Sequence, residues 1–263
     1  MDEDLKLEPW IAYVQQRPHA RLRLFCFHYA GAGASVFRDW VNELPQEIGI
    51  HPVQLPGREN RFTEPLFTEM HLVVTALERA LAPYFDLPFA FFGHSMGALI
   101  AFELIRRLRK VKGPLPSYLF VSGRRAPQLP SSGEPMHNLP RSELMKRLHE
   151  LEGMPTELLA QEGMMDWLLP IIRADFMLCE KYQYAEEEPF DLPLTVFGGA
   201  DDSHVDPTEL AAWFQHTRGS CRLLILPGNH FFLQTARKQL IKVIVNDIRE
   251  LISFRPLATN THK

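Results

Sequence analysis

The sequence predicts an α/β fold in which helices cover both faces of a mainly parallel β-sheet. Short apolar runs alternate along the chain with segments of helical periodicity, which is the pattern of βαβ units. The alternation is interrupted over residues 124–190, an interval too long for a single crossover helix. A hydrophobic fraction of 46% and a charged fraction of 23% are ordinary for a globular protein, so the 263 residues can bury a sizeable core.

Six short apolar runs are the expected strands. The first, residues 21–27, leads into the small-residue stretch 30–33, as a buried strand does before a tight loop. The other five strands are expected at residues 50–55, 89–92, 118–122, 194–197 and 222–226. Helices are expected between them, among others at residues 72–81, 99–108 and 232–252.

We interpret residues 124–190 as a helical lid inserted into a single domain that spans residues 1–263. Prolines at positions 127, 130, 135 and 140 predict an extended entrance to the lid. Two helical faces are expected after this entrance. They contain, first, Leu144, Met145, Leu148 and Leu151 and, second, Met165, Leu168, Leu169, Ile172, Phe176 and Cys179, with Pro170 near the first turn or at a kink.

Charge and cysteine content exclude several classes of protein. A net charge of −4 without a basic tail argues against nucleic-acid binding. The N-terminus lacks the basic and apolar regions of a secretory signal, and no apolar run is long enough to span a membrane. The three cysteines, Cys26, Cys179 and Cys221, are too few and too scattered for a disulfide framework or a zinc cluster. We therefore expect a cytoplasmic protein without a nucleic-acid or membrane partner and, because no exposed apolar seam is evident, a monomer.

The most informative motif is Gly-His-Ser-Met-Gly at residues 93–97. It follows an apolar run and precedes a helical segment, which is the context that a G-x-S-x-G nucleophile elbow requires. Glycines are needed at both ends because side chains there would clash in the strained turn. The motif therefore predicts an α/β-hydrolase fold with Ser95 as the nucleophile. Its neighbour His94 is expected to point away from the nucleophile and to pack beneath the elbow.

A serine nucleophile needs a histidine that takes its proton and a carboxylate that orients the histidine. In the α/β-hydrolase fold these residues follow in the order Ser, Asp or Glu, His, each on a loop after a strand. Asp201 and Asp202 follow the fifth expected strand, and His230 follows the sixth. The sequence thus supplies a complete candidate catalytic triad.

An oxyanion hole is expected from two backbone N–H groups. One belongs to Met96, the residue after the nucleophile, and the other comes from the loop after an early strand. That loop is residues 28–33, hereafter the oxyanion loop, and its small residues let the backbone approach a substrate carbonyl. Ala30 is the candidate second donor.

Six segments of the chain match one family. They are residues 27–36, Leu-Pro-Gly-Arg at 55–58 with Arg61, the elbow 93–97, Arg-Ala-Asp-Phe at 173–176, residues 199–205 and residues 228–233. On these motifs the chain resembles the stand-alone type II thioesterases of nonribosomal peptide and polyketide synthesis, relatives of the external thioesterase of fatty acid synthase. The resemblance covers nearly the whole chain. Leu-Pro-Gly-Arg and Arg-Ala-Asp-Phe are its most restrictive motifs, because the elbow alone fits any α/β-hydrolase.

The resemblance implies Ser95 as nucleophile, His230 as general base and Asp202 as acid, with Asp201 a poorer fit. It further implies a serine thioesterase that hydrolyses acyl thioesters from the phosphopantetheine arms of acyl or peptidyl carrier proteins, and so edits or releases acyl groups. No metal or organic cofactor of its own is implied, because the substrate is carried on the arm of the partner.

One departure from the family concerns the oxyanion loop. The family often reads Pro-x-Ala-Gly-Gly there, whereas this chain has His28 and Ala32 at the proline and second glycine positions. We therefore expect the loop to differ from the family in conformation and still to supply an oxyanion donor.

The lid is rich in methionine. Thioether side chains repack around varied apolar shapes, so such a surface suits acyl chains of different shape. We therefore hypothesise that the underside of the lid lines an acyl chamber, with Met165, Trp167 and Phe176 as candidate substrate-binding residues. The six methionines of the lid are Met136, Met145, Met154, Met164, Met165 and Met177.

Two alternatives remain open from the sequence. One is a carboxylesterase that uses the same triad on free oxygen esters, and the other is a non-catalytic module that only binds carrier proteins. An intact triad weighs against the second. A basic run at 106–112 could dock an acidic carrier protein, but cations at a helix C-terminus complement the helix dipole, so a solvated helix end is the favoured interpretation.

Overall fold

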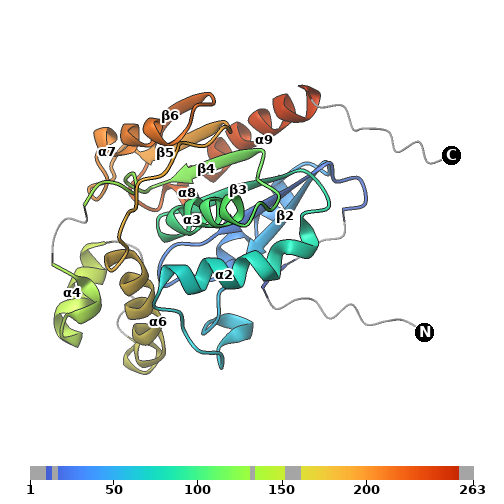
Figure 1. The fold of residues 1–263 in the computed structure, drawn as a ribbon. Coiled ribbons are helices and arrows are strands. Elements are labelled where there is room, and N and C mark those ends of the chain that lie inside the picture. The colour runs from blue at the N-terminus through green and yellow to red at the C-terminus, as the bar shows by residue number, and fades with distance from the viewer. Residues whose placement is uncertain (1–9, 14–16, 131–133, 152–160, 255–263) are drawn as a thin grey trace, which may run out of the picture.

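A computed structural model of the chain describes residues 10–13, 17–130, 134–151 and 161–254. Its centre is a six-stranded sheet in which all neighbouring strands are parallel, in the order β2-β1-β3-β4-β5-β6 (Figure 1). The strands are β1 (Leu22–Phe27), β2 (Ile48–Val53), β3 (Phe89–His94), β4 (Tyr118–Ser122), β5 (Leu194–Gly199) and β6 (Cys221–Leu226). All six lie where the apolar runs predict them, and β2 begins two residues earlier than expected.

Helices cover the sheet on both faces. Helices α2 (Met70–Leu81) and α3 (Met96–Lys110) pack on one face, and α9 (Arg237–Phe254) packs on the other. The expected closing helix 232–252 is divided into α8 (Phe232–Thr235) and α9, with Ala236 between them. The shorter helices are α1 (Trp40–Glu43), α7 (Pro207–Ala211) and the 3₁₀ helices η1 (Ala34–Phe37), η2 (Glu59–Arg61), η3 (Ala82–Tyr84), η4 (Met136–Asn138) and η5 (Ala212–His216).

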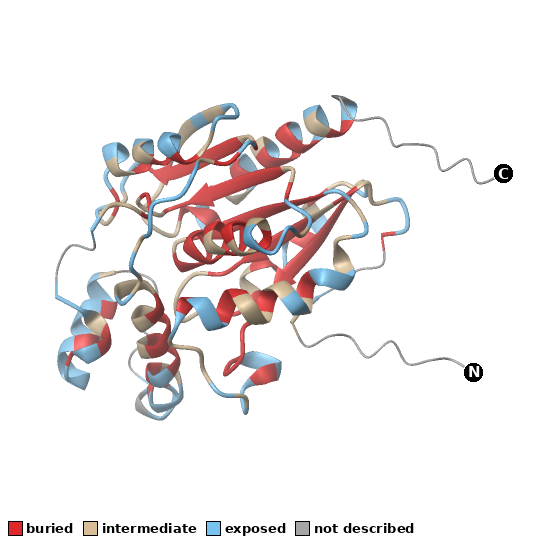
Figure 2. Cartoon of the chain, viewed as in Figure 1, coloured by how far each residue is buried: buried red, intermediate tan, exposed pale blue. Residues whose placement is uncertain are grey.

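The apolar strands form because both of their faces are covered. Side chains alternate along each strand, so Phe25 and Phe91 enter the core beneath α2 and α3, whereas Leu24 and Phe92 enter the core beneath α9. Figure 2 shows the central strands buried along most of their length. This two-sided burial fixes the carboxyl ends of the strands, from which the loops of the site emerge.

The described part of the lid contains α4 (Arg141–Glu150) and α6 (Glu162–Glu180), between β4 and β5 in the chain. The two helices share a small apolar core of their own, which includes Leu144, Leu148 and Met165. Arg173 in α6 also donates hydrogen bonds to backbone oxygens before α4, at His137 (2.8 Å) and Leu139 (2.7 Å). Pro170 lies inside α6 rather than at its first turn. The lid helices stand beyond the carboxyl ends of the strands (Figure 1).

Acidic side chains pair with the basic run at the end of α3. Arg106 and Arg109 both contact Glu187, at 2.9 and 2.6 Å, and Arg107 contacts Glu78 at 2.6 Å. These ion pairs favour the interpretation of the run as a helix end that is stabilised within the fold. None of the helices in the described part of the chain has the length and apolar character of a membrane span.

Candidate active site

Ser95 lies in a sharp turn between β3 and α3. Its φ of 52° belongs to the left-handed region, and its backbone N–H donates to the Ser122 oxygen of β4 (2.8 Å). A Cβ on Gly93 would lie 2.2 Å from the Gly97 oxygen, and a Cβ on Gly97 would lie 2.1 Å from the Phe27 oxygen. Both contacts are with backbone, so no side chain can move aside. The turn therefore needs glycine at both positions, as the motif predicts.

His94 packs beneath this turn, as expected. It is fully buried, and its Nδ1 forms a hydrogen bond with the Ser122 hydroxyl (2.8 Å). Burial, together with the nearby His230, holds the pKa of His94 well below its usual value. His94 is therefore a neutral packing residue.

His230 follows β6 and contacts an aspartate that follows β5. Its Nδ1–H donates to Asp202 Oδ2 at 2.8 Å, and Asp202 Oδ1 accepts the His204 backbone N–H at 2.9 Å. The Asp202 side chain is 1% exposed. Although burial opposes the change, the His230 hydrogen bond lowers the pKa of Asp202, so this carboxyl remains ionised. Asp201 is exposed to solvent, so Asp202 is the carboxylate that orients the histidine.

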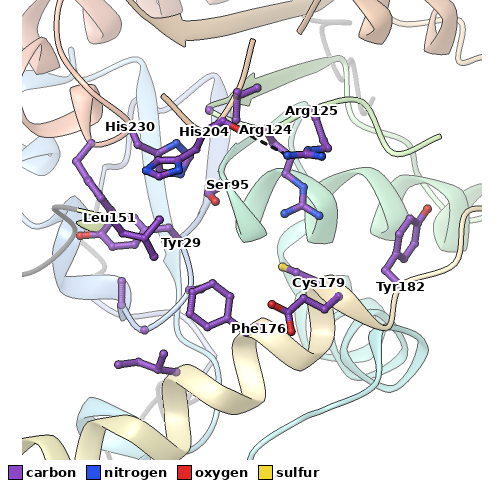
Figure 3. Close-up of a pocket in the computed structure, with 18 of the residues that line it drawn as sticks. Tyr29, Ser95, Arg124, Arg125, Leu151, Phe176, Cys179, Tyr182, His204 and His230 are labelled. Atoms are coloured by element: carbon purple, nitrogen blue, oxygen red, sulfur yellow. Dashed lines mark hydrogen bonds between the residues drawn. The ribbon is translucent and has the colours of Figure 1, made fainter. Parts of the chain in front are cut away.

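Ser95 and His230 open into the same cavity, of about 830 Å³. Figure 3 shows both residues at one end of it, with His204 beside the imidazole. Because Asp202 occupies Nδ1 of His230, Nε2 is the ring nitrogen left for the cavity. A serine, a histidine and a carboxylate thus converge from three loops, an arrangement suited to acyl transfer through a covalent serine intermediate.

The oxyanion loop is held by a buried carboxylate from the lid. Asp175 of α6 accepts a hydrogen bond from the Gly31 N–H (2.7 Å), and Gly31 supplies the left-handed residue of the loop (φ 77°). Arg58 joins Asp175 through two hydrogen bonds of 2.6 and 2.8 Å and donates a third to the Ala32 oxygen (3.0 Å). The Arg58 and Asp175 side chains are 5% and 1% exposed. The loop conformation therefore depends on contacts with α6 and with Arg58.

His28 also fits this loop without the family's proline. Its ring is buried, and Nδ1 forms a hydrogen bond with the Tyr29 oxygen (2.9 Å). Burial lowers the pKa of His28 to about 4, so the ring is neutral near pH 7.

Arg58 and Asp175 are the functional residues that sequence reasoning missed. They lie in the two most restrictive family motifs, Leu-Pro-Gly-Arg and Arg-Ala-Asp-Phe. These motifs marked both residues as important to the family. Their contact could not be predicted from a local pattern, because the two residues are 117 positions apart in the sequence.

The candidate oxyanion donors lie on either side of Ser95. Ala30 lines the cavity from the oxyanion loop. Met96 is buried and is the first residue of α3, where a backbone N–H has no partner within the helix. The pairing of these two N–H groups around a substrate oxygen stays a prediction.

The lid lines the cavity with residues other than methionine. From α4, the residue that follows it and α6, the lining residues include Leu148, Leu151, Leu168, Ile171 and Phe176. Phe176 therefore faces the cavity as expected (Figure 3).

The expectation for Met165 and Trp167 is corrected by the structure. Met165 is fully buried in the core between α4 and α6, and Trp167 is 63% exposed with its ring beside Phe62. The apolar stripe of α6 is divided between two neighbours, because Met165 and Leu169 face α4 while Phe176 faces the cavity. Among the described residues that line the cavity there is no methionine. Met154 lies outside the described residues.

Comparisons with known proteins agree with this geometry. The family model of the thioesterase domain matches residues 22–248. The gramicidin S biosynthesis protein GrsT of Aneurinibacillus migulanus is 41% identical over 94% of this chain and 97% of its own length. The protein named linear gramicidin dehydrogenase LgrE, of Brevibacillus parabrevis, is 45% identical over 94% of this chain and 95% of its own length.

Solved structures show the same relationship. The RedJ thioesterase from the prodiginine pathway of Streptomyces coelicolor is 38% identical, with a TM-score of 0.83 over 88% of this chain and 92% of its own. ClbQ, from the colibactin nonribosomal peptide and polyketide pathway, has a TM-score of 0.85 and 29% identity over 90% of this chain and 100% of its own. This chain therefore belongs to the thioesterase family and has its α/β-hydrolase fold.

Proposed function

We propose that this protein hydrolyses acyl thioesters on the phosphopantetheine arms of acyl or peptidyl carrier proteins during nonribosomal peptide or polyketide synthesis. The observation that carries the proposal is the His230–Asp202 hydrogen bond of 2.8 Å beside a serine elbow in one cavity. ClbQ belongs to a nonribosomal peptide and polyketide pathway, and GrsT and RedJ belong to the gramicidin S and prodiginine pathways, which supports the choice of substrate.

The proposed reaction has two steps. His230 takes the proton of Ser95, whose oxygen attacks the thioester carbonyl and forms a C–O bond. The N–H groups of Ala30 and Met96 stabilise the oxyanion, and Asp202 stabilises the imidazolium. The C–S bond then breaks and releases the pantetheine thiol, which needs little protonation because thiols have a pKa of about 8.5. His230 finally activates a water molecule that hydrolyses the acyl-serine. The scheme uses no metal or organic cofactor of the protein's own.

The size and lining of the cavity suit an acyl substrate. Its volume of about 830 Å³ lies within the usual range for small-molecule sites, roughly 300–1,000 Å³. Leucine and isoleucine side chains of the lid give one wall an apolar character, which favours an acyl chain. We infer that the carrier protein remains outside while its arm enters, and that the enzyme acts as a cytoplasmic monomer.

The test is hydrolysis of a panel of acyl-loaded carrier proteins beside free oxygen esters with the same acyl groups. We expect turnover of the carrier-bound thioesters, and its loss in Ser95→Ala. Ser253→Ala, which removes an exposed hydroxyl of α9, is the matched control and should retain activity. Turnover of oxygen esters alone would indicate a carboxylesterase. Binding of carriers without turnover, and without fluorophosphonate labelling of Ser95, would indicate a non-catalytic module.

A further inference from the structure

Arg124 projects into the cavity from the loop that follows β4. The loop begins next to the nucleophile, because the Ser122 oxygen accepts the Ser95 N–H at 2.8 Å. Trp213 anchors it by donating its indole N–H to the Arg124 oxygen (2.7 Å). In Figure 3 the Arg124 guanidinium points into the space between Ser95 and Cys179. A substrate bound at Ser95 therefore passes close to this cation.

The charge of Arg124 is not matched by a carboxylate within the described part of the chain. Three arginines line the cavity, and two of them form ion pairs, Arg58 with Asp175 and Arg125 with Glu209. Arg124 forms none among the described residues, and its buried Nε has no hydrogen-bond partner there. A guanidinium has five N–H donors, and leaving donors buried and unused is costly. Such a side chain is suited to a ligand that brings its own acceptor.

The neighbour of Arg124 is a weak acceptor. The thiol of Cys179 lines the same cavity as Arg124, and burial raises the pKa of this thiol above its usual value. The thiol is therefore neutral near pH 7 and does not compensate the positive charge. The guanidinium of Arg124 faces the cavity without an ion-pair partner among the described residues.

The same wall indicates which acceptor fits. Glu180 lines the cavity near Cys179, and its carboxylate binds the His137 ring (2.5 Å) and accepts the backbone N–H groups of Met136 (2.7 Å) and His137 (3.1 Å). A second carboxylate brought by the substrate would be repelled by this charge, whereas a neutral carbonyl oxygen would not. The phosphate of a pantetheine arm is too distant to be the acceptor of Arg124. It lies at the far end of the arm from the thioester, whereas the backbone of Arg124 lies near the nucleophile.

We propose that Arg124 donates hydrogen bonds to a carbonyl oxygen on the acyl chain, close to the thioester carbonyl, and so selects β-ketoacyl and peptidyl groups over alkyl groups of equal length. This inference rests on the proposed hydrolysis at Ser95 and names the substrate class of that reaction. Arg124 is thus a specificity-determining residue rather than a member of the triad.

The test compares β-ketooctanoyl with octanoyl pantetheine thioester, and N-acetylglycyl with pentanoyl thioester, in the native protein and in Arg124→Met. We expect the kcat/KM ratio of carbonyl-bearing to alkyl substrate to fall about tenfold or more in Arg124→Met, chiefly through KM, because the variant loses a hydrogen bond from a charged donor. Arg124→Lys should restore part of the ratio. Arg79→Met, which removes an exposed arginine of α2, is the matched control and should leave the ratio unchanged.

Other outcomes separate this inference from the proposed function. Fluorophosphonate labelling of Ser95 checks that each variant retains a folded site. The native protein and both Arg124 variants could all hydrolyse the octanoyl thioester and show the same kcat/KM ratio of carbonyl-bearing to alkyl substrate. This result would overturn the role of Arg124 and leave the thioesterase function intact. A native preference for a glutaryl thioester that disappears in Arg124→Met would identify a carboxylate ligand and overturn the carbonyl assignment. Failure of the native protein on every thioester would overturn the function and the inference with it.

Discussion

Two adjacent aspartates follow β5, and their side chains have opposite surroundings. Asp202 is buried and contacts His230, whereas Asp201 faces solvent. The sequence limits the candidates for the catalytic carboxylate to these two residues, because the order of strands and loops can be predicted from local patterns. The side-chain directions that distinguish the two depend on the packing of the loop against β6. The elbow, in contrast, was fully predictable, because the steric need for Gly93 and Gly97 is contained in five consecutive residues.

The first prediction concerns these two aspartates. Asp202→Asn should lower kcat by about 10⁴, because an amide favours the wrong tautomer of His230. Asp201→Asn should retain kcat within about twofold, because the exposed Asp201 side chain does not bind His230 and behaves as a surface position. Steady-state kinetics on one acyl thioester checks both variants. Equal losses in the two variants would show that Asp202 has no special role.

Helix α6 contacts three parts of the molecule with three of its sides. Met165 packs against α4, Phe176 faces the cavity and Asp175 binds the oxyanion loop. Periodicity predicts the helix correctly, but an apolar stripe does not say which neighbour each residue meets. The Met165 expectation failed for this reason. The contact between Arg58 and Asp175 was beyond prediction because it joins distant segments, although both motifs were recognisable.

The second prediction concerns the link between α6 and the oxyanion loop. Asp175→Asn should lower kcat by roughly 10–100-fold with a smaller change in KM, because a displaced loop weakens oxyanion stabilisation, where the loss of one donor costs roughly 10²–10³. It should also destabilise the fold by about 3–5 kcal/mol, because the Arg58 charge remains buried without its partner. Kinetics and denaturant unfolding measure the two effects.

Two further variants separate catalysis from stability. Asp166→Asn removes an exposed carboxylate of the same helix, so it should change neither quantity appreciably. The double variant Arg58→Met with Asp175→Leu removes both buried charges and should recover stability without recovering kcat. Recovery of kcat in this double variant would contradict a positioning role for Asp175.

The third prediction concerns the wall of the cavity. Phe176→Ala should change the order of preference among acyl-chain lengths, because it enlarges the cavity on the side of the lid. Trp167→Ala should leave that order unchanged, because the exposed indole does not itself line the cavity and contacts it only through Phe62. Rates on a series of straight-chain acyl thioesters test the pair. If Trp167→Ala changed the order of preference among acyl-chain lengths and Phe176→Ala did not, Trp167 rather than Phe176 would be the residue that contacts the acyl chain.

The whole molecule places its chemistry at one edge of a parallel sheet. Ser95, Asp202 and His230 each follow a different strand, and parallel strands bring their carboxyl ends together. This arrangement was predictable, because apolar runs and their order along the chain determine it. Arg124 could not be identified from the sequence, because no sequence pattern shows whether an arginine that follows a strand will form an ion pair in the fold.

The fourth prediction concerns the pH dependence of stability. Burial lowers the pKa of His28 and of His51 to about 4, whereas the unfolded chain has histidine pKa values of about 6.5. Between these values the unfolded chain binds more protons, so stability falls as the pH decreases from about 6.5 to about 4. Each residue contributes up to about 1.4 kcal/mol per pH unit. Denaturant unfolding at a series of pH values measures this slope.

A pair of variants assigns that slope. His51→Phe should reduce it, because a phenylalanine can occupy the space beside Phe25 and Tyr84 without titrating. His71→Phe, at an exposed histidine of α2, should leave it unchanged. Identical slopes in His51→Phe and the native protein would contradict the buried, neutral state of His51.

Mass spectrometry of the acyl-enzyme shows whether a thioester acylates Ser95. The native protein is mixed with an acyl pantetheine thioester, quenched with acid within one turnover and digested. We expect the peptide containing Ser95 to carry the mass of the acyl group, and the adduct to be absent from Ser95→Ala. Release of the free acid by Ser95→Ala at the native rate, or an adduct on another residue, would contradict the role of Ser95 as the nucleophile.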